Sequence, residues 1–323
     1  MGCIDQKITE RYCLYNGDCV EVIRKIPDKS IGLTVYSPPF CGLYNYSSDK
    51  RDMSNSVTYE DFFKHYSYLV PEIERVMQSG RICAVHCMDI PNPGQKTGMF
   101  DLPGRLIKIH SKFRFHFVGR IAIWKEPLRV TIRTRLKHLT HKQLVKDSCQ
   151  SFVAGGDYLL LFQKKGENLN PVQHKFGFEE YIGDREIPSQ LIKYKGEKIQ
   201  KLNKLSHWIW RNYASCFWDD IRIDNVLPYK KAKDIEDEKH IHPLQLDVVE
   251  RCIVMWSNPE DIIFTPFMGV GSEVYGALKY DRKAIGIELK GSYYRQAVLN
   301  IMSIGIKDQK KLTTPLDFFL SKK

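Results

Sequence analysis

Four short runs of apolar residues are rich in β-branched or aromatic side chains and are bounded by glycine, proline or charged residues. They are residues 31–36, 81–86, 117–124 and 158–163. Runs of this length without polar alternation are typical of strands in parallel sheets that are covered by helices on both faces. Between the first two runs, apolar residues recur at helical spacing over 59–78. Strand, helix and strand in this order predict a βαβ unit.

The C-terminal part of the chain continues this alternation. A helical pattern over 244–256 follows Pro243, a residue suited to the start of a helix. Then come a strand at 261–265, a glycine-bearing turn, a helix at 272–280 and a strand at 284–288. We therefore predict an α/β fold with a doubly wound, mostly parallel, Rossmann-like sheet.

The segment 164–206 interrupts the alternation, because it is polar, rich in lysine and has little apolar periodicity. It is typical of an insert or a small lobe. We predict a first half of the main domain at 1–165, a central insert at 166–235 and a second half at 236–323.

The formal net charge of +11 has its source in one central block. Between Arg105 and Arg211 there are 22 Lys and Arg residues but only 9 Asp and Glu, and aromatic residues such as Trp124 and Trp208 are interspersed. Lys and Arg neutralise phosphates, and aromatic rings offer stacking faces. The block therefore suits a polyanion such as nucleic acid, although a solvated basic surface would have the same composition.

The remaining composition excludes several protein classes. With 323 residues, 43% hydrophobic and 27% charged, the chain can bury a full core. No stretch approaches the roughly 20 apolar residues of a membrane helix, and the N-terminus lacks the apolar core of a signal peptide. The nine cysteines are scattered, and the histidine pairs 138/141 and 240/242 lack partner ligands. We expect a soluble, cytoplasmic protein with no metal site and no membrane association.

Two motifs carry candidate chemistry, and the first is the C-terminal unit 261–290. Its strand, Gly269-x-Gly271 turn, helix and second strand ending at Glu288 predict half of a mononucleotide-binding unit. Glycines let the backbone approach a ligand closely, and an acid about 20 residues further on can accept hydrogen bonds from ribose hydroxyls. A plain tight turn is the alternative.

The second motif, Ser37-Pro38-Pro39-Phe40, directly follows the predicted strand 31–36. Open α/β sheets bind ligands at the carboxyl ends of their strands. The two prolines remove N–H groups, so nearby carbonyls can accept hydrogen bonds from a substrate, and the aromatic ring can stack on a planar group. In isolation the tetrapeptide could equally be a turn that ends the strand.

Together the two motifs resemble those of the exocyclic-amino DNA methyltransferases. Ser-Pro-Pro-Phe is similar to their catalytic tetrapeptide, and TPFMGVGS is similar to their S-adenosylmethionine loop. The catalytic half precedes the cofactor half, which is the order of the β group of this family. Shorter matches occur at 16–19, 26–30, 124–125 and 242–245.

The resemblance implies a methyl transfer from S-adenosylmethionine to an amine of a base flipped out of double-stranded DNA. It implies that Ser37 and Pro38 accept the N–H groups of the amine, with Pro39 as the next residue of the catalytic tetrapeptide. Phe40 would stack on the base, and the 166–235 insert would recognise the DNA sequence. The residues that it implies for cofactor binding are Asp18, Thr265, Pro266, Phe267, Gly269, Gly271, Ser272 and Glu288.

Thr265 departs from the family pattern, and Ser37 occupies a position that differs between the subgroups of the family. Thr265 replaces the usual acid of the cofactor loop, so a charge that normally faces the cofactor ammonium is missing or is supplied elsewhere. Ser37 resembles the cytosine-N4 subgroup more than the adenine-N6 subgroup. We therefore expect cytosine N4 as the target, with adenine N6, an inactive DNA-binding protein of this fold, and RNA or protein methylation as alternatives.

The resemblance also suggests a bacterial or phage-encoded protein that acts as a monomer or homodimer. A cognate restriction nuclease is a possible partner.

Overall fold

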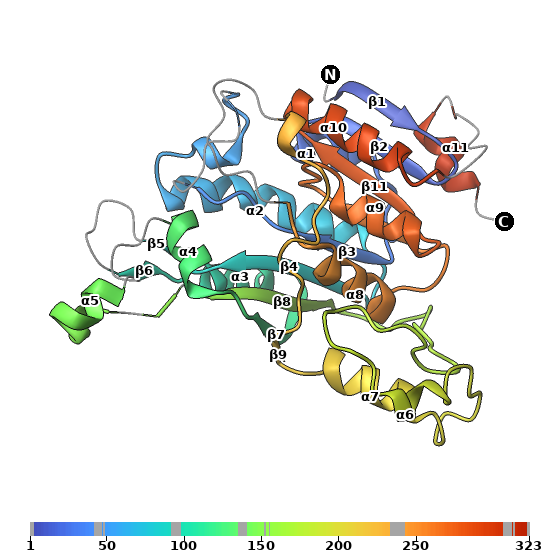
Figure 1. The fold of residues 1–323 in the computed structure, drawn as a ribbon. Helices are drawn as coiled ribbons and strands as arrows, with labels where there is room; N and C mark the ends of the chain where they lie inside the picture. Colours follow the sequence, from blue (N-terminus) through green and yellow to red (C-terminus); the bar gives the residue numbers. More distant parts are fainter. Residues whose placement is uncertain are drawn as a thin grey trace.

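The computed structural model describes residues 3–41, 47, 49–91, 98–134, 141–151, 153–154, 156–232, 243–305, 312 and 314–321. A single nine-stranded sheet lies at its centre (Figure 1). In order across the sheet, the strands are β1 (Cys3–Ile8), β2 (Tyr12–Gly17), β11 (Lys283–Glu288), β10 (Ile262–Thr265), β3 (Leu33–Tyr36), β4 (Ile82–Met88), β8 (Asp157–Lys164), β7 (Phe115–Ile123) and β9 (Phe217–Trp218). Two further short strands, β5 (Ile90–Pro91) and β6 (Met99–Phe100), pair with each other.

Five adjacent strands of the large sheet, from β2 to β4, run parallel. On one side β1 is antiparallel to β2, and on the other β8 is antiparallel to both β4 and β7, while β9 runs parallel to β7. The prediction of a mostly parallel sheet is confirmed. Because the five strands run the same way, the loops after them meet at one edge of the sheet.

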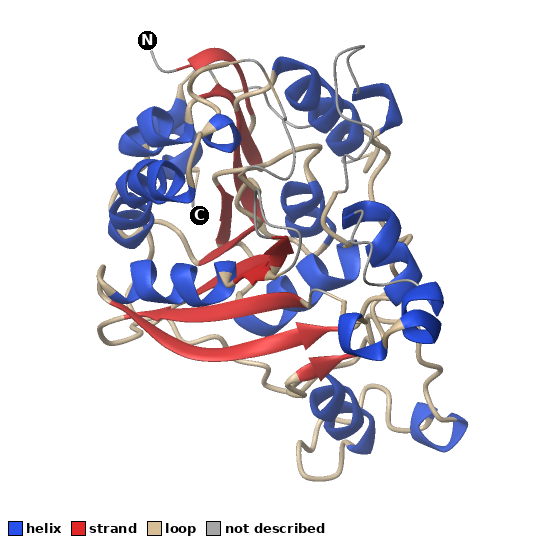
Figure 2. Ribbon diagram, turned by 90° about the vertical axis from the view of Figure 1, so that its left-hand side faces the viewer, coloured by secondary structure: helices blue, strands red, loops and turns tan. Residues whose placement is uncertain are grey.

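Helices cover both faces of the sheet, as Figure 2 shows for the blue helices on either side of the red strands. One face packs against α1 (Cys19–Val22), α2 (Tyr59–Val76), α3 (Leu102–Ser111) and α11 (Pro315–Leu320). The other packs against α8 (Leu246–Trp256), α9 (Ser272–Lys279) and α10 (Gly291–Met302). The doubly wound architecture is therefore confirmed.

The α2 helix illustrates how the sequence forms these covering elements. Thr58 caps it by accepting the backbone N–H of Asp61, and the chain becomes extended at Met77. Phe62 and Ile73 are among the apolar residues that recur along one side of the helix, and both are completely buried. The 3.6-residue period thus turns one stripe toward the sheet.

Four helices lie beyond these layers, two at each edge of the sheet. α4 (Pro127–Thr134) and α5 (His141–Lys146) lie between the carboxyl end of β7 and the start of β8. α6 (Ser189–Ile192) and α7 (Lys204–Tyr213) follow the far end of β8, and Figure 1 shows them on the opposite side of the molecule from α5. The 3-10 turns are η1 (Ile23–Lys25), η2 (Met53–Asn55), η4 (Ser148–Gln150) and η5 (Lys230–Ala232).

The apolar runs 117–124 and 158–163 do form strands, but the prediction that these strands run parallel to their neighbours was wrong. β7 and β8 are antiparallel to their neighbours, and Phe117 and Val118 of β7 are 40% and 51% exposed. These strands lie near one end of the sheet, where helices do not cover both faces completely. An apolar run therefore does not require a parallel neighbour.

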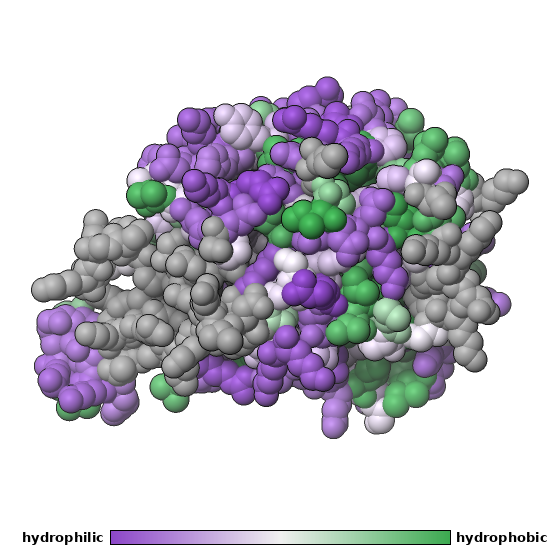
Figure 3. Space-filling view, turned by 90° about the horizontal axis from the view of Figure 1, so that it is seen from above, coloured by the Kyte–Doolittle hydropathy of each residue, from purple (hydrophilic) through white to green (hydrophobic). Residues whose placement is uncertain are grey.

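No helix in the part of the chain described above is long and apolar enough to cross a membrane. Of the residues that Figure 3 colours by hydropathy, most are hydrophilic, with separate hydrophobic patches between them.

Candidate active site

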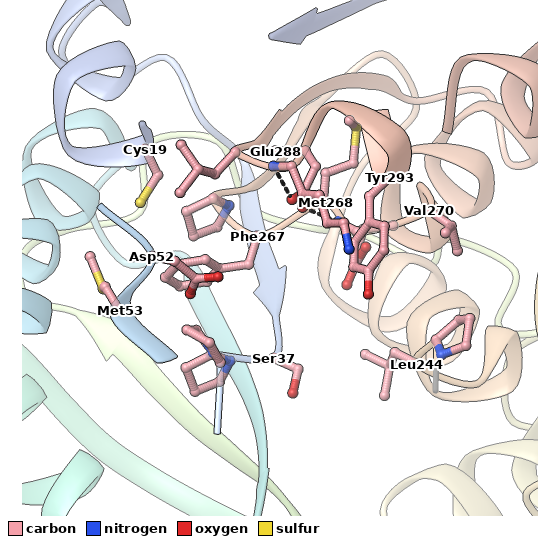
Figure 4. Close-up of a pocket in the computed structure, with 18 of the residues that line it drawn as sticks. Cys19, Ser37, Asp52, Met53, Leu244, Phe267, Met268, Val270, Glu288 and Tyr293 are labelled. Carbon is pink, nitrogen blue, oxygen red and sulfur yellow. Dashed lines mark hydrogen bonds between the residues drawn. The ribbon is translucent and has the colours of Figure 1, made fainter. Parts of the chain in front are cut away.

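A pocket lies where four of the parallel strands end. Asp18 follows β2, Ser37 follows β3, Pro266 follows β10, and Glu288 is the last residue of β11; all four line the pocket. The sequence motifs are thus brought together by the strand order, since β11, β10 and β3 are neighbours in the sheet. In Figure 4, Ser37 and Glu288 lie at opposite ends of the labelled group, with Phe267 between them.

The structure brings ten of the twelve predicted site residues to this pocket. They are Asp18, Ser37, Pro38, Pro39, Phe40, Pro266, Phe267, Gly269, Ser272 and Glu288. The remaining two, Thr265 and Gly271, lie beside it: Thr265 is buried in β10, and Gly271 caps the start of α9.

Both glycines of the turn have backbone angles that favour glycine. Gly269 has φ of 54° and Gly271 has φ of 96°. A Cβ on Gly271 would meet Ala297 Cβ at 3.2 Å, so this glycine also permits close packing of α9 on α10. A Cβ on Gly269 would meet nothing within 4 Å, which leaves the turn open on its pocket side.

Glu288 holds this turn against the end of β11. Its Oε2 accepts the backbone N–H of Gly269 at 2.8 Å, and its Oε1 accepts the backbone N–H of Lys290 at 2.8 Å. Each carboxylate oxygen retains a second acceptor direction for a ligand. Burial raises the pKa of Glu288 to about 7, although the two backbone hydrogen bonds act in the opposite direction.

Asp18 begins the next helix along this edge. Its Oδ1 accepts the backbone N–H of Val20 at 2.8 Å, so it is the N-cap of α1. Burial raises the pKa of this carboxyl above its ordinary value. The cap fixes the side chain at the mouth of the pocket.

A second acid, Glu273, lines the pocket after the loop that has Thr265 in place of the usual acid. The Thr265 hydroxyl is buried and has no hydrogen-bond partner among the described residues. Glu273, in the first turn of α9, lines the pocket, and burial raises its pKa to about 8. The pocket therefore contains two carboxyl groups, the buried Glu273 and the partly exposed Glu288, which can ionise when a positively charged ligand binds. Sequence reasoning missed Glu273, although an acid directly after the Gly-x-Gly-Ser turn was a usable signal.

Ser37 begins the predicted catalytic tetrapeptide, and its Oγ lies 3.3 Å from Nδ1 of His86. Nε2 of His86 is 3.2 Å from Oδ2 of Asp157, and the Lys125 ammonium is 3.2 Å from the same carboxylate oxygen. Sequence reasoning did not identify this group. Its signal was the polar His86 at the end of an apolar strand that neighbours the strand before Ser37.

Further pocket residues were not among the predicted site residues, although six of them lie in the segments that carry the family resemblance. They come mainly from loops and helix starts, where no periodic pattern marks them: Gly17, Cys19, Arg51, Asp52, Met53, Pro243, Leu244, Met268, Val270, Leu289, Lys290 and Tyr293. The described residues contain no group of three or more His, Cys, Asp and Glu that could hold a metal ion. Of the histidine pairs considered above, His138, His240 and His242 lie outside the described residues.

Comparison with known proteins identifies the family of the chain. The DNA methylase family of N6 and N4 methyltransferases matches residues 31–299. The chain belongs to this family. The Type II methyltransferase M1.MboII of Moraxella bovis is 40% identical over 296 residues, which cover 90% of this chain and 97% of that protein. M.BglII of Bacillus subtilis is 23% identical, and the alignment covers 87% of this chain and 66% of M.BglII.

Two solved structures share the fold. TTHA0409 of Thermus thermophilus, in complex with S-adenosyl-L-methionine, has a TM-score of 0.61 at 19% identity and covers 94% of this chain and 100% of that one. The cytosine-N4-specific PvuII DNA methyltransferase has a TM-score of 0.60 at 14% identity, covering 98% and 95%. The fold is thus that of the DNA methyltransferases.

S-adenosylmethionine is the cofactor of this family, and the pocket residues fit it. The turn at Gly269 is open toward the pocket, and Glu288 has acceptor directions for ribose hydroxyls. Pro266 and Phe267 provide apolar surface, and Glu273 and Glu288 provide acid groups for a cationic ligand.

Proposed function

We propose that the protein is a site-specific DNA methyltransferase that modifies the exocyclic amine of a flipped base, with cytosine N4 as the favoured target. One observation carries the proposal: Ser37-Pro38-Pro39-Phe40 and the Gly269–Glu288 cradle line the same pocket. An inactive DNA-binding protein would have no need to retain both halves. Bound S-adenosylmethionine supplies a methyl group on a sulfonium, and the C–S bonding pair stays with sulfur when the methyl leaves.

The residues after β3 are proposed to align the amine. An amine on an aromatic ring is a weak nucleophile, because its lone pair is delocalised into the ring. Ser37 Oγ and the Pro38 carbonyl would each accept one N–H, drawing the nitrogen toward sp³ geometry so that its lone pair leaves conjugation and points toward the pocket's cofactor side. Phe40, which is 7% exposed, would stack on the base. The base leaves the duplex at a cost of about a few kcal/mol.

The choice of target base rests on Ser37. The amines of cytosine and adenine present the same two N–H donors, and Phe40 can stack on either ring. Cytosine is favoured by Ser37 and by the family resemblance of that position. The matched family includes methyltransferases of both N6 and N4 amines, so adenine N6 is the alternative.

Nucleoside mass spectrometry of DNA from cells that express the protein tests the base directly. We expect N4-methylcytosine, and far less of it when Ser37→Ala is expressed at the same level. N6-methyladenine without N4-methylcytosine would overturn the choice of base and leave an amino-methyltransferase. Methylated RNA or protein with unmodified DNA would overturn the DNA substrate.

DNA would approach the edge of the sheet at which the pocket lies. The basic central block has one part at this edge and another part at the opposite edge. Residues 124–156 connect strand ends at this edge and include the exposed Lys142 and Lys146 of α5. Residues after Lys164 start from the opposite edge, and α7 packs with Met255 and Tyr280, near the far ends of α8 and α9. We therefore assign phosphate contacts to the α4–α5 segment rather than to α6 and α7.

The 166–235 insert was expected to read sequence, and its boundaries remain a prediction. Among the residues of the insert that the structure describes, the last part approaches the pocket: Leu227 and Ala232 pack with Val270 and Tyr293 of the cofactor half. Arg129 of α4 also forms an ion pair with Asp224 at 2.9 Å. We propose that sequence contacts come from this last part together with α4 and α5.

Charge reversal of two lysine pairs tests which edge of the sheet contacts the DNA phosphates. Lys142→Glu with Lys146→Glu should weaken binding to duplex DNA and make the slope of log affinity against log salt shallower by about 1–2. Lys198→Glu with Lys201→Glu is the matched control, because these exposed lysines lie between α6 and α7. Fluorescence anisotropy at several salt concentrations measures both. An equal loss in both variants would contradict the assignment.

A further inference from the structure

The hydroxyl of Ser37 belongs to a buried chain of polar groups that continues away from the pocket. His86 lies between Ser37 and Asp157, with contacts of 3.3 Å from Nδ1 and 3.2 Å from Nε2. His86 is 7% exposed, and Asp157 is 3% exposed. Lys125 pairs with Asp157 from the other side.

Strand register explains why residues so distant in sequence meet. Tyr36 of β3 lies opposite Val85 of β4, so Ser37 and His86 are each one residue further along. Met88 of β4 lies opposite Asp157 of β8, and residues two apart on a strand share a face, so His86 and Asp157 are diagonal neighbours. The register of the sheet thus places His86 and Asp157 on β4 and β8, and Ser37 directly follows β3.

The chemistry of the three groups assigns their hydrogens. An ionised Asp157 can only accept, so Nε2 of His86 must carry the hydrogen of that contact. Nδ1 of a neutral imidazole is then an acceptor, and the Ser37 hydroxyl donates to it. With its hydrogen turned toward His86, Ser37 Oγ presents its lone pairs in other directions, which is the state needed to accept an N–H.

We propose that His86 is a positioning residue that acts through Ser37, first fixing its hydroxyl and then taking up the proton that the reaction releases. The proposal rests on the function proposed above. The amine nitrogen forms its bond to the methyl carbon as the C–S bond breaks, so the positive charge passes from sulfur to nitrogen. That nitrogen gives one proton to Ser37 Oγ while the Ser37 hydroxyl proton moves to Nδ1 of His86. The charge ends on the imidazolium beside the Asp157 carboxylate.

A purely structural role for His86 would also explain its burial, since buried polar groups normally have partners. The two roles differ in their dependence on Ser37. A packing defect would slow the reaction whether or not Ser37 is present. A residue that acts through Ser37 has nothing to act on once that hydroxyl is removed.

A double-mutant cycle under single-turnover conditions tests this difference. His86→Ala should lower the rate of methyl transfer by roughly 10²-fold, as for loss of a positioned proton acceptor. His86→Asn should lose less, because its amide oxygen can still accept the Ser37 hydroxyl but cannot take up the proton. In the Ser37→Ala background, both His86 substitutions should change the remaining rate by less than about threefold. If His86→Ala does not fold, the cycle with His86→Asn gives the same comparison.

Two measurements do not depend on turnover. Calorimetry should give the same cofactor affinity for His86→Asn and wild type. Nitrogen-15 NMR of labelled histidine should show His86 as the Nε2–H tautomer, with an Nδ1 resonance that shifts in Ser37→Ala. Additive effects in the cycle, or an Nδ1–H tautomer, would overturn the role of His86. Absence of methyl transfer to DNA by the wild type would instead overturn the proposed function.

Discussion

Ser37→Ala should lower the rate of methyl transfer by roughly 10²-fold or more while cofactor affinity and thermal stability stay nearly unchanged. The substitution removes an acceptor that is used in the transition state, and losses of this size follow removal of one such positioned group. It removes little packing, because Ser37 lies at the end of β3 and borders the pocket.

A second serine on the same segment provides a matched control. Ser30 precedes β3, at the other edge of the sheet, and its hydroxyl donates to the Pro27 carbonyl at 2.7 Å. Ser30→Ala should therefore leave the rate of methyl transfer unchanged. Single-turnover transfer of a labelled methyl group to duplex DNA measures both variants, and a full rate for Ser37→Ala would remove Ser37 from the active site.

The sequence predicted the parts of this molecule in which a local pattern has one structural solution. Apolar runs and helical spacing located β3, β4, β10, β11, α2, α8 and α9 to within a few residues. The motif residues were found because each follows a buried strand, and strands that run parallel bring their carboxyl ends to one edge.

The elements that sequence reasoning missed depend on tertiary contacts. β2 (Tyr12–Gly17) is buried throughout but contains Asn16 and ends in Gly17, so its composition does not mark a buried strand. Asn16 is accommodated because its side-chain amide donates to the Glu288 and Leu289 carbonyls at 2.8 and 2.9 Å. The first of these partners is 272 residues away in the sequence, and no local pattern predicts it.

The polar group behind Ser37 was missed for the same reason. His86, Asp157 and Lys125 come from three strands or strand ends, and each looks like an isolated polar residue in an apolar context. Only the register of β3, β4 and β8 shows that they converge. Likewise, nothing in the composition of the basic block predicts that α5 and α7 lie at opposite edges of the sheet.

Glu288→Ala should weaken the binding of S-adenosylmethionine by about 1.5–3 kcal/mol, the usual loss for hydrogen bonds to a charged group. The loss has two sources. The ribose hydroxyls lose their acceptor, and the backbone N–H groups of Gly269 and Lys290 lose the carboxylate that holds the turn. Isothermal titration calorimetry measures the affinity, and equal values for the variant and the wild type would place the cofactor elsewhere.

The raised pKa of Glu288 predicts how cofactor binding depends on pH. Burial raises the pKa of Glu288 to about 7, so near neutral pH a large fraction of the ligand-free protein carries a proton there. Ribose hydroxyls and a cationic ligand favour the ionised form, which means that binding lowers this pKa and releases a proton. Affinity should therefore fall as pH is lowered below about 7. Titrations in buffers of different ionisation enthalpy count the protons released.

Glu273 titrates in the same pocket, with a pKa raised to about 8, and must be separated from Glu288. Glu288→Ala should release fewer protons than the wild type and show a smaller decline in affinity below pH 7. Glu273→Gln should keep a decline below pH 7 and lose the proton release near pH 8, because its amide cannot ionise. If affinity in the wild type does not change between pH 6 and 8, neither carboxyl group contacts the bound cofactor.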